Sequence, residues 1–442
     1  MCSIIVSSKP IENLDLCNKF TKLRGPDQTN HLKIGKFDYV HNLLSITGKF
    51  TTQPFIKNNK VCIYNGEIYN HDEFGSGYQS DGECLIDAYE QHGWKFSQKL
   101  DGEFAIFLHD EEKNIIVFST DTFRTKPLFY SIESGEIAVA TYEHPLKVLG
   151  FDNIKKAKPN TIYKFDLNSH TLIEESLVQF DCRQHKTHFW DWKTAFEISI
   201  AKRTKNLDKK MFIGLSSGYD SGAICCELLR QNTPFKSYLV VGTENPGVHQ
   251  ARLDLLIKRG LPYHILNKYD PKMAETTEYV KSNLDDFKWT ICSASSSYNE
   301  FNTDVKEEGG SHKFAFICDS AAKDGYKVIL SGQGPDEIYS DYGFQGKKIY
   351  EHSNFGGLFP ENLADIFPWN SFFGSSMESY IAKEEYVGGA YGIEVRYPFL
   401  DKNVVQEFLW LDHRLKNSDY KSPIKFYFDT VQYPYAVEKR GF

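Results

Sequence analysis

One segment limits the possible folds of this chain more than any other. Residues 211–216, MFIGLS, form an apolar run, SGYDS after them has turn residues, and GAICCELLRQ (222–231) has helical spacing. The same order recurs in the apolar runs SYLVV (237–241) and KVILSG (327–332), each next to a segment of helical spacing. Strands that alternate with helices indicate a doubly wound parallel sheet of the α/β class.

The beginning of the chain follows a different pattern. Segments 61–70, 102–121 and 135–141 are rich in the aromatic and β-branched residues that are typical of strands, and 84–93 has helical spacing. We therefore expect an α+β domain with a large antiparallel component.

A weakly periodic, polar stretch separates the two patterns. We place the first domain at residues 1–165, a linker at 166–190 and the α/β domain at 191–442, whose tail from 375 we expect to be mostly helical.

Composition excludes several classes of function. The 51 basic and 59 acidic residues give a net charge of −8, which opposes a general binder of nucleic acid or of acidic membranes. No apolar run approaches the roughly 18–20 residues of a membrane span, and the start, MCSIIVSSKP, lacks the pattern of a signal peptide. Nine cysteines at irregular spacing, without a Cys-x-x-Cys repeat, favour reduced thiols. We expect a cytoplasmic protein.

Cys2 is the first residue with evident chemistry. Removal of the initiator methionine would leave a cysteine whose own α-amino group, with a pKa just below 8, can act as the base that makes a thiolate. A cysteine at this position can also be incidental, so Cys2 alone is a weak signal.

Two further motifs suit an attack by that thiolate on an amide. Asn65 and Gly66 follow the strand VCIY, and their amide and backbone N–H groups could stabilise an oxyanion by roughly 3–4 kcal/mol. Further on, the segment from Ser80 to Glu83, with Asp81, offers a carboxylate for a substrate ammonium. The alternative for Asn-Gly-Glu is an ordinary turn at the end of a strand.

Several blocks in this part resemble a known domain. They are MCSI (1–4), RGPD (24–27), LSI (44–46), QP (53–54), NGEIYNH (65–71), SDGE (80–83), LDGEFAIFLHD (100–110) and PLFY (127–130). In order and spacing they resemble the class II glutamine amidotransferase domain of the asparagine synthetase family. The resemblance implies an amino-terminal-nucleophile fold of αββα layers.

The resemblance also implies roles for individual residues. Cys2 would be the nucleophile, Asn65 and Gly66 the oxyanion hole, and Glu67 and Asp81 the ligands of the glutamine amino group. The backbone around Ile46 would line the pocket.

One departure concerns the glutamine carboxylate. Leu43 stands where the family usually has the arginine that pairs with it, and an apolar side chain cannot replace a guanidinium. Another basic residue could reach in, glutamine could bind weakly, or free ammonia could be the practical donor. Arg24 and Arg124 are candidates, although we expect Arg24 to brace its loop instead.

The segment from Leu215 to Ser221, LSSGYDS, has the features of a phosphate-binding turn. Small residues let the backbone approach phosphates, and the N–H groups at a helix start favour anions. Asp220 could bind Mg²⁺, while the missing Gly-x-x-x-x-Gly-Lys signature disfavours a kinase-type ATPase. An ordinary serine-rich turn is the alternative.

Later blocks extend the resemblance almost to the end of the chain. SGQGPDE (331–337) follows another strand, GIEVRYPFLD spans 392–401, and KSPIK spans 421–425. With LSSGYDS, these blocks resemble the ATP-pyrophosphatase synthetase domain of the same family. Asp336 should lie near Asp220, and the two carboxylates could share Mg²⁺ ions that bridge the phosphates of ATP.

The resemblance implies a site for ATP and for the acid that it activates. The residues implied for ATP are Leu215, Ser216, Gly218, Asp220, Ser221, Val241, Ser331 and Gly332, with Lys421 neutralising the leaving pyrophosphate and Asp220 and Asp336 binding the metal. Gln333 and Glu394 would contact the acyl substrate.

Two departures fall in this second site. Ser217 replaces a loop glycine, which is tolerable if its φ is negative. Gln333 replaces a glutamate that the family ties to formation of the aspartyl adenylate, and a neutral amide cannot pair with an ammonium as a carboxylate would. The stretch 292–313 also differs from the family where the acyl substrate usually binds.

We therefore expect a glutamine-dependent, ATP-driven amide-forming ligase with ATP and Mg²⁺ as cofactors and aspartate as the default acid. The alternatives are an amidotransferase of the same architecture that acts on another carboxylate (a sugar acid or a biosynthetic intermediate), a β-lactam-synthetase-like enzyme and a non-catalytic relic. The oligomeric state stays open, with a homodimer as one option.

Overall fold

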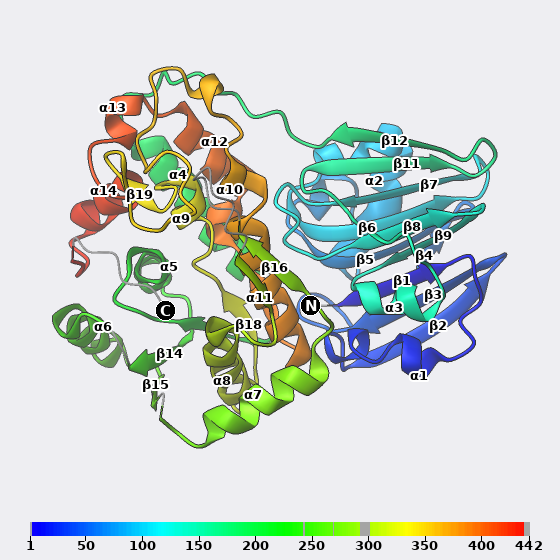
Figure 1. Cartoon of the computed structure of the whole chain (residues 1–442), viewed down its shortest axis with the longest axis horizontal. Coiled ribbons are helices and arrows are strands. Elements are labelled where there is room, and N and C mark those ends of the chain that lie inside the picture. The colour runs from blue at the N-terminus through cyan, green and yellow to red at the C-terminus, as the bar shows by residue number, and fades with distance from the viewer. Residues whose placement is uncertain (1, 242–243, 268, 292–300, 437–442) are drawn as a thin grey trace.

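The computed structural model describes residues 2–241, 244–267, 269–291 and 301–436. The chain forms two halves that lie side by side in Figure 1, with the amino-terminal strand β1 close to their junction. Within the described ranges no helix is long and apolar enough to cross a membrane.

The first half contains two antiparallel six-stranded sheets. Their strand orders are β10-β8-β9-β1-β3-β2 and β12-β11-β7-β6-β5-β4. The strands are β1 (Ser3–Ser7), β2 (Gln28–Ile34), β3 (Phe37–Leu43), β4 (Phe55–Lys57), β5 (Lys60–Ile68), β6 (Gly102–Asp110), β7 (Ile115–Thr120), β8 (Phe129–Glu133), β9 (Glu136–Ala140), β10 (Lys155–Lys156), β11 (Thr161–Asp166) and β12 (Thr171–Ser176).

Alternation along these strands builds four layers. In β5, Val61 and Ile63 enter the core between the two sheets, whereas Cys62 and Tyr64 enter the core beneath helix α2 (Cys84–His92). The other sheet buries its outer face under α1 (Leu14–Cys17) and α3 (Glu143–Val148). Side chains two apart share a face of a strand, so one strand serves two cores. The αββα prediction is confirmed.

The first half extends beyond the predicted boundary at residue 165. Strand β12 pairs with β11 along its whole length, so residues 166–176 belong to a hairpin of the second sheet and not to a linker. Because β12 is an exposed edge strand, its sequence lacks the apolar alternation that would have revealed it. The division into domains at the remaining boundaries stays a prediction.

The second half is built on a parallel five-stranded sheet. Its strand order is β15-β14-β13-β18-β21. The strands are β13 (Lys210–Gly214), β14 (Lys236–Val241), β15 (Tyr263–Asn267), β18 (Tyr326–Leu330) and β21 (Glu394–Arg396), and two small antiparallel pairs are β16 (Lys288–Ile291) with β17 (Phe301–Asp304) and β19 (Gly343–Phe344) with β20 (Lys347–Lys348).

Helices lie on both faces of this sheet. In Figure 1, α5 lies on one side of β14 and β18, and α8 lies on the other. The helices are α4 (Trp190–Thr204), α5 (Tyr219–Arg230), α6 (Pro246–Lys258), α7 (Lys272–Asn283), α8 (Gly309–Lys323), α9 (Pro335–Ile338), α10 (Asn370–Phe373), α11 (Ser376–Ala390), α12 (Lys402–Trp410), α13 (His413–Lys416) and α14 (Ser422–Val431). The doubly wound α/β prediction is confirmed, as is the largely helical tail.

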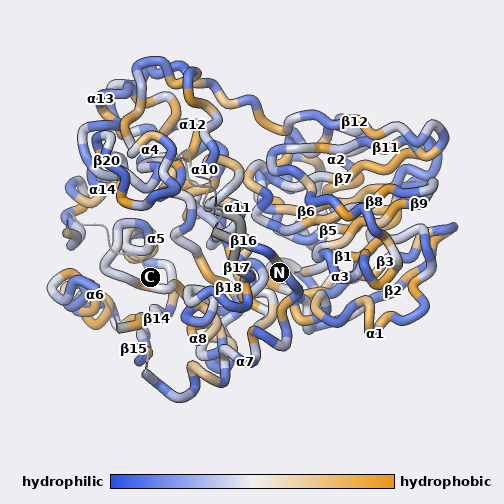
Figure 2. Tube along the Cα trace, in the orientation of Figure 1, coloured by the Kyte–Doolittle hydropathy of each residue, from blue (hydrophilic) through white to orange (hydrophobic). Residues whose placement is uncertain are grey.

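Helix α11 runs along the junction of the two halves (Figure 1). Hydrophobic stretches follow the strands of both halves, while the outer loops are mostly hydrophilic (Figure 2). The junction itself contains buried ion pairs: Glu385 of α11 contacts Arg24 at 2.7 Å and Lys126 at 3.0 Å, and all three side chains are almost fully buried. The two halves are thus held together by charges that solvent does not reach.

Candidate active sites

Cys2 lies immediately before β1 and is buried, with 8% of its surface exposed. The backbone N–H of Leu44 donates to its Sγ at 3.5 Å, because β1 pairs with β3 and the chain leaves β3 beside the start of β1. Burial raises the pKa of the Cys2 thiol to about 11. A thiol in these surroundings needs a base to become a nucleophile.

Cys2 opens into a cavity of about 30 Å³. Six of the residues predicted for glutamine chemistry line it: Cys2, Leu43, Ile46, Gly66, Glu67 and Asp81. They come from strands β3 and β5, the residue before β1, the loop after β3 and the turn at Asp81–Glu83, so the structure brings together the set that the motifs predicted.

Asn65 and Gly66 are neighbours on β5, and Gly66 lines this cavity. Asn65 is buried, and neither atom of its amide group has a hydrogen-bond partner within the described residues. A Cβ on Gly66, whose φ is +150°, would lie 2.1 Å from the carbonyl oxygen of Glu103. A buried amide without partners is expensive unless a ligand satisfies it, so its geometry suits the predicted oxyanion hole.

The two carboxylates predicted to hold an ammonium are already partly engaged. Asp81 accepts hydrogen bonds from the Tyr64 hydroxyl and the Ile68 N–H, both at 2.7 Å. Glu67 accepts one from Thr47 at 2.7 Å and pairs with Arg396 at 2.8 Å. Each carboxylate oxygen has a second lone pair, so both can still accept from a ligand.

Glu394 is not where the motif predicted it. It lines the Cys2 cavity. It is not among the residues that line a second, larger cavity (the nucleotide cavity, which contains most of the residues predicted for ATP), where we expected it to contact the acyl substrate. The reason is the alternation of β21: Glu394 and Arg396 share the face that meets the first half, and the guanidinium of Arg396 binds the Glu394 carboxylate at 2.7 Å. The second half therefore completes the pocket of the first.

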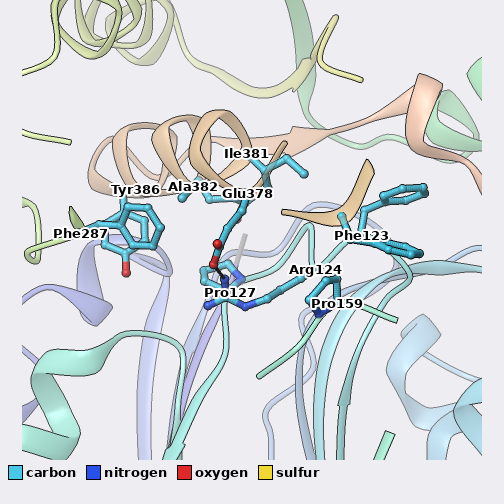
Figure 3. Close-up of a pocket in the computed structure, with 11 residues that line it drawn as sticks. Phe123, Arg124, Pro127, Pro159, Phe287, Glu378, Ile381, Ala382 and Tyr386 are labelled. Atoms are coloured by element: carbon cyan, nitrogen blue, oxygen red, sulfur yellow. Dashed lines mark hydrogen bonds and ion pairs between the residues drawn. The ribbon is translucent and has the colours of Figure 1, made fainter. Parts of the chain in front are cut away.

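Neither arginine considered as a substitute at position 43 reaches this cavity. Arg24 is fully buried, donates to the Cys2 carbonyl oxygen at 3.0 Å and pairs with Glu385, so it braces its loop as expected. Arg124 points at Glu378 of α11, 3.2 Å away, in a separate small cavity between the halves (Figure 3). A lysine that the motifs did not single out, Lys49, lines the Cys2 cavity.

The second cavity is larger, about 370 Å³, and lies at the carboxyl ends of β13 and β18. Eight predicted residues line it: Ser216, Gly218, Asp220, Ser221, Ser331, Gly332, Gln333 and Asp336. Ligands of open α/β sheets bind at this end of the strands, which supports the predicted nucleotide site.

One predicted ATP residue lies outside that lining, and another cannot be placed because its side chain is not among those that the structure describes. Leu215 is buried at the end of β13, where its N–H donates to the carbonyl oxygen of Tyr238 at 2.9 Å. Val241 ends β14, and its side chain lies outside the described part of the structure, as do residues 292–300 of the predicted acyl-binding stretch.

Lys421 joins the two aspartates of the predicted metal site. Its Nζ lies 2.7 Å from Asp220 and 2.8 Å from Asp336, and its side chain is buried. Burial alone would lower the pKa of Lys421, but the two carboxylates raise it well above its ordinary value, so the ammonium is retained. Lys421 itself has the left-handed conformation, with φ of 48°. Three residues from separate motifs thus form one charged cluster.

The turn before α5 (residues 216–218) forms hydrogen bonds with residues that the motifs did not single out. Arg252 of α6 is fully buried and donates to the carbonyl oxygens of Gly218 (2.8 Å) and Ser216. Ser217 is not among the residues with positive φ, which is the condition for replacing a glycine there. Its N–H donates to the carboxylate of Glu244. These contacts are tertiary, and no local pattern predicts them.

The part of the cavity around Gln333 also contains residues that the motifs missed. Gln333 donates from Nε2 to Glu384 of α11 at 3.2 Å, and Glu384 lines the cavity. Tyr342, Tyr350 and Tyr380 line it as well.

Comparison with known proteins agrees with this arrangement. Residues 1–178 match the family described as glutamine amidotransferase domain. A Methanocaldococcus jannaschii protein provisionally named glutamine-hydrolyzing asparagine synthetase 1 is 27% identical over 87% of this chain and 71% of its own. The glutamine-hydrolyzing asparagine synthetase B of Escherichia coli strain K12 is 25% identical over 91% of this chain and 74% of its own.

The chain resembles the asparagine synthetases. The similarity runs through both halves, and residues 1–178 match the glutamine amidotransferase domain family. The relatives are not uniform in name, because "Amidase chyE" of Penicillium rubens is 24% identical over 72% of this chain and 53% of its own length.

Proposed function

We propose that this chain is a glutamine-dependent, ATP-driven amide-forming ligase that releases AMP and pyrophosphate. One observation carries the proposal: the N–H of Ser331, which lines the nucleotide cavity, donates to the carbonyl oxygen of Arg396 at 2.8 Å. Arg396 in turn binds Glu67 and Glu394 in the wall of the Cys2 cavity. The two cavities are thus connected through the neighbouring strands β18 and β21. This proximity suits the transfer of a small intermediate from one cavity to the other.

In the first half-reaction Cys2 would attack the amide carbon of glutamine. Its thiol needs a base, and the α-amino group of a processed Cys2 would take the proton and pass it to the departing ammonia. The Asn65 amide and the Gly66 N–H would bind the oxyanion, while Glu67 and Asp81 would hold the substrate ammonium. Water would then release glutamate from the thioester.

In the second half-reaction a carboxylate would attack the α-phosphorus of ATP held over the turn from Ser216 to Ser221. Pyrophosphate would leave, and Lys421 would neutralise its growing charge. Ammonia would then attack the acyl carbon and AMP would leave.

Asp220 and Asp336 are the residues that would hold Mg²⁺. The ion would screen the charge of the ATP phosphates when bound. Two carboxylates fit this requirement because Mg²⁺ commonly takes one or two protein carboxylates and completes its shell with phosphate oxygens and water. Among the described residues no group of three or more His, Cys, Asp or Glu side chains could hold a metal by itself.

Aspartate is the default acid, because proteins named asparagine synthetase resemble this chain over both halves. A different carboxylic acid is the second candidate. It is favoured by Gln333, which replaces the glutamate expected for aspartate chemistry, and by the three tyrosines that line the cavity.

A screen of carboxylic acids tests the proposal most simply. The full chain is incubated with ATP, Mg²⁺, ammonium chloride and one acid at a time, and pyrophosphate and AMP are measured. We expect equimolar release of both with aspartate or with one other acid. If the folded protein fails to release pyrophosphate with every acid tested, a non-catalytic relic is the better interpretation.

A further inference from the structure

Arg252 of α6 is a buried cation without a carboxylate partner among the described residues. Its side chain is 0% exposed, and its guanidinium donates to three carbonyl oxygens, those of Ser216, Gly218 (2.8 Å) and Pro434 (3.2 Å). It forms no ion pair in the described part of the chain, and its Nη2 has no hydrogen-bond partner there. A buried charge is costly unless an opposite charge balances it, so a bound anion is the expected counter-charge.

The hydrogen bonds of Arg252 fix the direction of two peptide groups in the turn before α5. Both peptides are trans, so the N–H groups of Ser217 and Tyr219 point away from Arg252. The Ser217 N–H donates to the carboxylate of Glu244, so one of these two groups already binds an anion. Tyr219 is the first residue of α5, where N–H groups have no partner within the helix and favour negative charge. Arg252 therefore directs donors of the turn toward anions.

Arg252 acts on a ligand only through the turn. It is not among the residues that line the nucleotide cavity, whereas the two turn residues that it holds are. At that cavity Asp220 and Asp336 share the ammonium of Lys421, and the phosphates of ATP would add further negative charge. A cation on the other side of the turn offsets part of this charge, and burial strengthens the effect because water does not screen it.

We propose that Arg252 is a positioning residue for the phosphates of ATP. It orients N–H groups of the turn, and the phosphate charge balances its buried guanidinium without direct contact between the two. This inference rests on the proposed function, because it assumes that ATP binds in this cavity.

The test compares the binding of Mg²⁺–ATP with that of adenosine, which lacks phosphates. Calorimetric titrations on the full chain and on Arg252→Met give both dissociation constants. In the variant, Kd for ATP should rise by roughly 10- to 100-fold, as expected for loss of a charged hydrogen-bonding group, while Kd for adenosine should change by less than about twofold. In pyrophosphate release with ammonia, the loss should appear in the KM for ATP and not in kcat.

Two further variants separate this role from a structural one. Arg252→Lys keeps the charge and part of the hydrogen bonding, so at least about fivefold of the lost ATP affinity should return. Arg259→Met is the matched control, because Arg259 is exposed at the end of the same helix and donates to Asn232 at 2.9 Å. Its Kd for ATP should stay within about twofold of the wild-type value.

Three results would overturn the inference while leaving the proposed function intact. They are an unchanged Kd for ATP in Arg252→Met, equal losses of ATP and adenosine affinity in that variant, and no recovery in Arg252→Lys. Absence of ATP binding to the wild type would instead reject the nucleotide site of the proposed function, and this inference with it. If the wild type binds ATP but releases no pyrophosphate with any acid, the proposed function alone fails.

Discussion

The two cavities differ in which part of the chain builds them. The Cys2 cavity is small, about 30 Å³, and draws Glu394 from the second half, with Arg396 behind it. The nucleotide cavity is about 370 Å³, and every described residue that lines it belongs to the second half. Changes in β21 of the second half should therefore disturb the Cys2 site, whereas changes confined to the first half should spare the nucleotide site.

The charges of the two sites differ in the same way. Near Cys2, three carboxylates (Glu67, Asp81 and Glu394) surround a cavity to which Arg396 brings a buried cation. At the nucleotide cavity the Lys421 ammonium lies between Asp220 and Asp336, and Lys383 also lines the cavity. The first site is suited to a substrate that carries an ammonium, and the second to phosphates and a metal ion.

The largest effect is expected from Asp220→Ala. Loss of this carboxylate removes a proposed metal ligand and the partner of Lys421, so pyrophosphate release should fall by on the order of 10³-fold or more. Glutamine hydrolysis should be retained, because Asp220 lies outside the Cys2 cavity. Both rates are measured on one preparation, and Asp429→Asn, at an exposed position of α14, is the control. Retained pyrophosphate release would remove Asp220 from the metal site.

Glu385→Gln should give the largest loss of stability. It leaves Arg24 and Lys126 buried with weakened partners, which should lower the free energy of unfolding by about 3–5 kcal/mol in denaturant titrations. Glu378→Gln is the matched control on the same helix. Its carboxylate is partly exposed, so a change below about 1 kcal/mol is expected. Equal losses in the two variants would contradict the importance of the buried junction.

The missing arginine at position 43 predicts a moderate change in glutamine affinity. Leu43→Arg should lower the glutamine KM by roughly one to two decades, with little change in kcat, because a charged hydrogen bond adds uniform binding. Lys49→Gln should raise KM if Lys49 is the cation that lines the cavity in its place. An unchanged KM in Leu43→Arg would show that the pocket already satisfies the carboxylate or is shaped for another donor.

The smallest effect concerns a lysine remote from both cavities. Lys416 is buried and donates to Gln184 at 2.7 Å and to backbone carbonyl oxygens, and burial lowers its pKa to about 7. Between pH 7 and 9 the unfolded chain keeps this proton while the folded chain loses it. The free energy of unfolding should therefore rise with pH, relative to Lys416→Met, by up to about 1.4 kcal/mol per pH unit. A difference that stays flat with pH would contradict the lowered pKa.

Much of the fold could be predicted from the sequence because its signals are local. The apolar run 211–216 and the helical spacing of 222–231 correspond to β13 and α5, and the helical spacing of 84–93 corresponds to α2. The motif residues around Cys2 and Asp220 also meet in two cavities as expected. Their assigned chemical roles stay predictions.

What the sequence did not predict depends on contacts between distant segments. Glu394 lies 392 residues after Cys2, and only the packing of β21 against the first half brings it to that cavity. Arg252 braces its turn from another helix, and Glu384 faces the nucleotide cavity because of the rotation of α11. Spacing within a motif contains no information about such placements.

Cys2→Ala tests the division of labour most directly. Product formation with the acid found in the screen is measured twice, once with glutamine and once with ammonium chloride. We predict that glutamine-supported product is lost while ammonia-supported product stays largely intact, because the thiolate serves only the first half-reaction. Equal loss of both activities in a folded variant would contradict the account.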